Sequence, residues 1–114
     1  MVTIYHNPRC SKSRQTLQLL QDNQITPEVV EYLKTPLSYD QLTKLLSKLG
    51  LTAREIIRTS EQEYKDLNLK DKTLSDEALL NAIVSAPKLM QRPIVVNGDK
   101  AAIGRPPEDV LGIL

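Results

Sequence analysis

The sequence is poor in cysteine, histidine and aromatic residues. Its 114 residues include one cysteine, one histidine, four tyrosines, and neither tryptophan nor phenylalanine. A single cysteine cannot form an internal disulfide, and it cannot by itself supply a thiolate cage for a metal. We therefore expect neither a structural disulfide nor a metal centre.

The charge balance is close to even. Fifteen basic residues against fourteen acidic ones leave a net charge of +1, which gives no overall field to attract nucleic acid or anionic lipid. No apolar run approaches the roughly 20 residues that cross a bilayer, and the N-terminus lacks the pattern of a secretory leader. With 40% hydrophobic residues the chain can build a core. We expect one cytoplasmic domain over residues 1–114 that binds neither nucleic acid nor membrane.

The two ends of the chain carry the strand signals. Residues 2–5 and 28–32 are rich in β-branched and aromatic side chains, and residues 11–22 between them suit a helix. Near the C-terminus, strands are predicted at 93–96 and 101–103, joined by the turn dipeptide Asn97-Gly98, and a last helix begins near Pro107.

The middle of the chain is predicted to be helical. It contains four N-cap signals, which are Ser38 with Gln41, Thr52 with Glu55, Ser60 with Glu63, and Ser75. The order of elements is therefore strand-helix-strand, a helical insertion over approximately residues 36–87, and then strand-strand-helix. This α/β order predicts a thioredoxin-like mixed sheet with the insertion between its two halves.

Cys10 stands where the first strand passes into the first helix. A thiol at a helix N-terminus meets unpaired backbone N–H groups and the positive end of the helix dipole, and both favour the thiolate. Arg9 and Arg14 add positive charge nearby, and His6 lies in the same loop. These features predict a reactive thiolate with a pKa below the usual value of about 8.5. The alternative is a small buried apolar cysteine with no chemical role.

The spacing around Cys10 excludes two familiar thiol motifs. Position 16, where a phosphatase loop would have arginine, is Thr16, and position 13, where a dithiol motif would have its second cysteine, is Ser13. The thiol therefore has no resolving partner in its own chain. His6 has three possible roles: electrostatic support of the thiolate, proton donation, or holding the turn that precedes Cys10.

Three further arginines stand at the ends of predicted segments. They are Arg58, Arg92 and Arg105. Guanidinium groups stay charged and offer planar, two-point donors that suit tetrahedral oxyanions. Taken singly, each arginine is better explained as a solvated surface charge, and only their convergence on the thiolate would make them a site. Arg92 precedes Pro93, at the position where thioredoxin-type folds place a cis-proline, so this bond is a candidate for the cis isomer.

Four blocks of the sequence strongly resemble the glutaredoxin-dependent arsenate reductases. The blocks are residues 5–14 (YHNPRCSKSR), 33–36 (LKTP), 92–96 (RPIVV) and 104–106 (GRP). The resemblance implies a thioredoxin-like core with a helical insertion, and an enzyme in which Cys10 attacks arsenate to form a covalent adduct. It also implies that glutathione, as co-substrate, joins the adduct, and that glutaredoxin completes the reduction to arsenite. No tightly bound cofactor is implied.

The resemblance also implies roles for individual side chains. Arg58, Arg92 and Arg105 would hold the oxyanion and its reduced product, and His6 would help to keep Cys10 ionised. Two other functions are compatible with the same fold. One is a redox-linked regulator that binds RNA polymerase, against which Ser13 argues because a disulfide sensor needs a second cysteine. The other is a monothiol protein that handles glutathione without an oxyanion substrate.

Overall fold

The computed structural model describes residues 1–114, which form two compact units. We call them the sheet unit (Met1–Thr35 together with Arg92–Leu114) and the helical unit (Pro36–Gln91). The helical unit starts at the residue where the insertion is expected to start, and it ends at Gln91 rather than near residue 87. None of the helices combines the length and the apolar character that crossing a bilayer requires.

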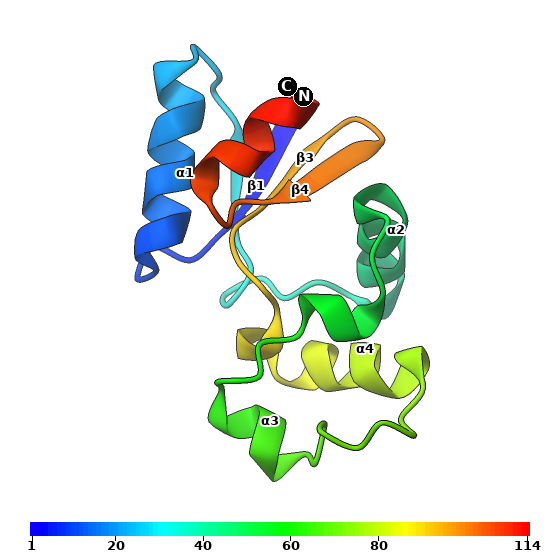
Figure 1. The fold of residues 1–114 in the computed structure, drawn as a ribbon. Helices are drawn as coiled ribbons and strands as arrows, with labels where there is room; N and C mark the ends of the chain where they lie inside the picture. The colour runs from blue at the N-terminus through cyan, green and yellow to red at the C-terminus, as the bar shows by residue number, and fades with distance from the viewer. The chain divides into compact units, whose positions relative to one another are not determined.

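The sheet unit contains four strands and two helices. They are β1 (Val2–His6), α1 (Ser11–Asp22), β2 (Glu28–Glu31), β3 (Ile94–Asn97), β4 (Lys100–Ile103) and the 3₁₀ helix η3 (Pro107–Ile113). The strand order is β2-β1-β3-β4, with β1 parallel to β2 and antiparallel to β3, and with β3 antiparallel to β4. This mixed sheet, visible in Figure 1, confirms the thioredoxin-like fold.

One face of the sheet carries the core of this unit. Ile4 of β1 pairs with Val95 of β3, and both are fully buried. They pack with Leu20 of α1 and Val110 of η3, so these two helices cover this face. The last helix is a 3₁₀ helix rather than the expected α-helix. The packing fixes the position of α1, and therefore of the loop that precedes it.

The backbone next to the sheet has three special conformations, one at a glycine and two at prolines. Gly98, in the turn between β3 and β4, has φ of 65°, a left-handed conformation that glycine adopts without strain. The Arg92–Pro93 peptide bond is cis, and so is the Arg105–Pro106 bond, which no sequence signal indicated.

The helical unit contains five helical segments. They are α2 (Tyr39–Leu49), the 3₁₀ helix η1 (Ala53–Ile56), α3 (Gln62–Asp66), α4 (Asp76–Ser85) and the 3₁₀ helix η2 (Pro87–Leu89). Ser38 and Gln41 form the predicted capping box at the start of α2, which ends at Gly50 with φ of 68°. Ser75 caps α4 as predicted.

The prediction that Ser60 caps a helix is wrong. The N-cap of α3 is Glu61, because the first helical hydrogen bond runs from the N–H of Tyr64 to the carbonyl of Glu61. Thr52 does form a capping box with Glu55, but at the start of a 3₁₀ helix.

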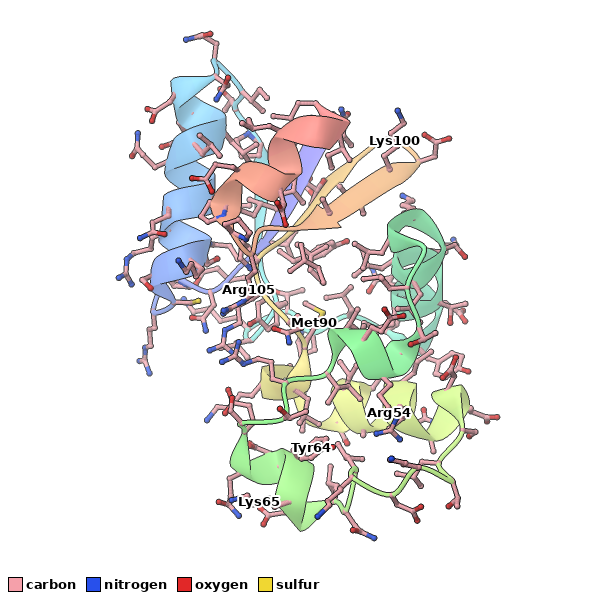
Figure 2. All side chains as sticks on the ribbon, viewed as in Figure 1. Arg54, Tyr64, Lys65, Met90, Lys100 and Arg105 are labelled. Atoms are coloured by element: carbon pink, nitrogen blue, oxygen red, sulfur yellow. The ribbon has the colours of Figure 1, made fainter.

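Arg54 ties a long loop of the helical unit to its core. Its two terminal nitrogens donate to the carbonyl oxygens of Leu69 (2.8 Å) and Asp71 (2.9 Å), and Figure 2 labels the side chain. The core itself is apolar, with Leu42, Leu79 and similar side chains almost completely buried.

Candidate active site

Cys10 occupies the N-cap position of α1. Its N–H donates to the carbonyl oxygen of Asn7 (3.0 Å), and its carbonyl accepts the N–H of Arg14 (3.0 Å). The loop before it is also fixed, because the N–H of Arg9 donates to Oδ1 of Asn7 (3.0 Å). These hydrogen bonds hold Cys10 in a defined position. The thiol is partly exposed, so a small molecule can reach it.

Opposing influences act on the Cys10 thiol. Burial is the largest single one, and it raises the pKa. The backbone N–H of Ser13, the hydrogen bond and charge of Arg92, and the backbone N–H of Lys12 all lower the pKa. Together they outweigh burial, and the pKa of Cys10 lies below its ordinary value. The thiolate fraction at neutral pH is therefore larger than for a free cysteine, and the thiolate is the nucleophilic form.

Arg105 contacts the sulfur directly. Its Nη2 lies 3.7 Å from Sγ of Cys10, and its Nε donates to the carbonyl oxygen of Arg92 (2.8 Å). Figure 2 shows this side chain at the end of β4 opposite to the end that carries Lys100. A guanidinium has five N–H donors, so those not used here can bind an oxyanion beside the sulfur. The structure thus brings Arg92 and Arg105 together at Cys10.

Gly104 allows Arg105 to approach the start of α1. A Cβ atom at this position would lie 2.5 Å from Oγ1 of Thr16 and 2.9 Å from Cγ of Pro93. Its N–H donates to the carbonyl oxygen of Pro93 (2.9 Å). Only glycine fits between these groups without displacing them. The sequence reasoning did not assign Gly104 a role, although its place directly before Arg105 was a signal.

His6 is buried and contacts Ser13. Its Nδ1 lies 2.7 Å from Oγ of Ser13, which also accepts the N–H of Asn7 (3.0 Å). Burial lowers the pKa of His6, the charge of Glu31 opposes this, and the charge of Arg14 lowers the pKa further. The imidazole is therefore mainly neutral at pH 7. Ser13, which sequence reasoning considered only as a missing second cysteine, joins His6 to the loop that holds Cys10.

The two arginines that flank Cys10 in sequence are both exposed. Arg14 donates from Nη1 to the carbonyl oxygen of Pro8 (2.9 Å), which braces the loop. Arg9 makes no side-chain hydrogen bond or ion pair within the protein. Their role as electrostatic support for the thiol stays a prediction.

Arg58 belongs to the helical unit. Its N–H donates to the carbonyl oxygen of Leu89 (2.7 Å), and its Nε lies 3.4 Å from a carboxylate oxygen of Glu61. Its predicted role in oxyanion binding stays a prediction.

Comparison with known proteins gives consistent matches along the chain. The model of the ArsC family matches residues 5–113. The chain belongs to the ArsC family. It is 60% identical to the uncharacterized protein YfgD of Escherichia coli K12, over 99% of this chain and 96% of YfgD. It is 50% identical to the arsenate reductase of Haemophilus influenzae, over 99% of this chain and 98% of that one.

One solved protein structure is nearly the same as the structure of this chain. The arsenate reductase of Vibrio cholerae superposes with a TM-score of 0.97 at 53% identity, covering 99% of this chain and 97% of the other. Membership of the family and these relatives support an oxidoreductase.

Proposed function

We propose that this protein reduces arsenate to arsenite, with Cys10 as the nucleophile. The observation that carries the proposal is a thiol of lowered pKa with the guanidinium of Arg105 only 3.7 Å from its sulfur. Membership of the ArsC family and the similarity to proteins named arsenate reductases support arsenate as the oxyanion. A guanidinium suits this substrate because it stays charged and presents two parallel donors.

The first step joins the enzyme to the substrate. The thiolate sulfur of Cys10 forms a bond to arsenic, one As–O bond breaks, and the departing oxygen takes up protons from solvent and leaves as water. We assign the binding of the remaining oxygens to Arg92 and Arg105, with Arg58 as a third donor. His6 takes a positioning role through Ser13, because burial keeps the imidazole mainly neutral. Arsenic is still As(V) in this adduct.

The two electrons that reduce arsenic must come from outside the chain, because Cys10 is its only cysteine. A glutathione thiol displaces a second oxygen as water and becomes bonded to arsenic. A glutaredoxin thiolate then attacks the glutathione sulfur, the sulfur–arsenic bond breaks, and its electron pair passes to arsenic. The products are a glutathione–glutaredoxin mixed disulfide and As(III) on Cys10. Water hydrolyses this last bond, which releases arsenite and restores the thiol.

We place this chemistry in the cytoplasm. A lone, partly exposed thiol is kept reduced by the thiol pool of that compartment.

A coupled assay tests the proposal. The purified protein is mixed with arsenate, glutathione, glutaredoxin, glutathione reductase and NADPH, and the consumption of NADPH is followed with the Cys10→Ser variant as the blank. We expect consumption that requires arsenate and glutaredoxin and that disappears in the blank. Equal rates with Cys10→Ser would remove Cys10 from the nucleophile role. Reaction with glutathione disulfide but not with arsenate would favour the glutathione-handling alternative.

A further inference from the structure

A cavity of about 230 Å³ lies beside the Cys10 loop, within the sheet unit. One wall is formed by residues 6–9, which are the end of β1 and the loop that leads directly to Cys10. The other wall is formed by Glu31 at the end of β2 and by Leu33 and Lys34, which follow it. The cavity shares residues 6–9 with the candidate active site, but the proposed function places no ligand in it.

The cavity lies on the side of the Cys10 loop away from the two arginines that approach the sulfur. In the sheet order β2-β1-β3-β4, the cavity is next to β2, whereas Arg92 precedes β3 and Arg105 follows β4. An oxyanion held by Arg92 and Arg105 would occupy their side of the sulfur. The side next to β2 is therefore left open to a second thiol that must reach the arsenic.

The charged groups of the cavity are two cations and one carboxylate. The cations are Arg9 and Lys34, and the carboxylate is Glu31. Lys34 and Glu31 form an ion pair at 3.5 Å, but their side chains are 77% and 39% exposed. Such an exposed pair contributes little to stability, so a ligand can exchange for it at small cost. Arg9 has no ion-pair partner in the protein, so it is available to a carboxylate.

A ligand that matches these groups has two negative charges and one positive charge. We propose that this cavity binds the charged amino-acid end of a small thiol peptide with two carboxylates and one ammonium group, which is the composition of glutathione. Arg9 and Lys34 bind carboxylate, and Glu31 binds the ammonium group. The cavity is smaller than most drug-sized sites of roughly 300–1,000 Å³, so it receives one end of the peptide while the thiol end extends past Arg9 toward Cys10.

This inference rests on the proposed function, but its test does not need turnover. The probe is S-methylglutathione, which has no free thiol and cannot react with Cys10. It is titrated into the isotope-labelled protein while the backbone amide resonances are followed by NMR. We expect the shifts to concentrate at residues 6–9 and 31–34. Shifts concentrated at Arg92 and Arg105, or no shifts at millimolar probe, would overturn the assignment.

A charge reversal with a matched control locates the site. Lys34→Glu should weaken the binding of S-methylglutathione by at least about tenfold, because an attractive contact becomes a repulsive one. The control is Lys100→Glu, which makes the same change on an exposed lysine of the same unit, outside the cavity. Equal weakening in the two variants would mean that the probe senses only net charge, and it would overturn the inference. The amide spectra of both variants also show whether each is folded.

The ligand side offers an independent check of Glu31. The N-acetylated form of the probe lacks the ammonium group, so it should bind several-fold more weakly than the probe itself. Equal affinities would overturn the assignment of Glu31. Where the probe binds as expected but the coupled assay shows no arsenate reduction, the proposed function fails and the cavity assignment stands. Where arsenate is reduced but the probe does not bind, the cavity assignment fails and the proposed function stands.

Discussion

The sheet unit and the helical unit differ in what they bury. All buried residues of the helical unit are hydrophobic, whereas the sheet unit also buries four polar ones, His6, Asn7, Ser13 and Thr16. A buried polar group costs free energy unless it has a hydrogen-bond partner. His6 ends β1, Asn7 lies in the loop before Cys10, and Ser13 and Thr16 lie in the first turns of α1.

The two units therefore use their buried residues differently, one for packing alone and the other also for positioning Cys10. In the helical unit, apolar side chains alone account for the core, and the polar anchor Arg54 binds carbonyl groups at its margin. In the sheet unit, the hydrogen bonds of Ser13 hold a loop in the one shape that places Cys10 at the start of α1. Polar burial in this protein therefore coincides with the candidate active site.

The largest expected effect in the sheet unit comes from removing the sulfur. Cys10→Ser should lower arsenate reduction by at least about 1,000-fold, since no second thiol can replace the nucleophile. Thermal unfolding should change little, because the side chain is only partly buried. The coupled assay and a melting curve measure the two effects. Substantial residual turnover would contradict the assignment.

A pair of serine variants compares a buried hydroxyl of the sheet unit with an exposed hydroxyl of the helical unit. Ser13→Ala should lower the free energy of unfolding by about 1–3 kcal/mol, because it leaves the N–H of Asn7 and Nδ1 of His6 without their partner. The matched change Ser85→Ala removes an exposed hydroxyl that only donates to the carbonyl of Ala82, so it should cost less than about 0.5 kcal/mol. Urea denaturation measures both. An equal loss in the free energy of unfolding for the two variants would contradict the difference between the units.

A pair of arginine variants separates catalysis from stability. Arg92→Lys should lower kcat/KM for arsenate by about tenfold, because a single ammonium replaces a two-pronged donor, and should leave stability nearly unchanged. Arg54→Lys should instead lower the free energy of unfolding by about 1 kcal/mol, since one of two carbonyl contacts is lost, with kcat/KM unchanged. An unchanged kcat/KM in Arg92→Lys would make Arg92 a surface charge only.

The elements of the fold could be predicted because their signals are local. The capping box of Ser38 and Gln41 and the turn at Gly98 each depend on neighbouring residues, and both form as predicted. The start of α3 is an exception, because its N-cap is Glu61 rather than the predicted Ser60.

The geometry of the site could be predicted only in part. The start of α1 identified Cys10, because the relevant N–H groups follow it directly in the chain. The contact of Arg105 with Cys10 joins residues 95 positions apart, and it depends on how β4 ends beside α1. The roles of Ser13 and Gly104 depend on which groups face them in space. Neither a serine nor a glycine indicates such a role by its identity alone.

The smallest and most specific effect is on how the reactivity of the Cys10 thiol depends on pH. Alkylation of Cys10 by iodoacetamide should follow a titration with a midpoint below about 8.5, because the Ser13 N–H, Arg92 and the Lys12 N–H together outweigh burial and lower the pKa. Arg92→Lys should change this midpoint, and Arg54→Lys, in the helical unit, should not. A wild-type midpoint at or above 8.5 would contradict a stabilised thiolate.

The same pKa shift predicts how stability depends on pH. Because the folded pKa of Cys10 lies below the unfolded one, the unfolded state binds more protons between the two values, and the free energy of unfolding rises with pH across that window. The gain is fully present above about 8.5 and is lost as pH falls through the folded pKa. Cys10→Ser should remove this rise, whereas Ser85→Ala should keep it. Urea denaturation across pH 6–9 measures the difference, and parallel curves for wild type and Cys10→Ser would show that the fold does not favour the anion.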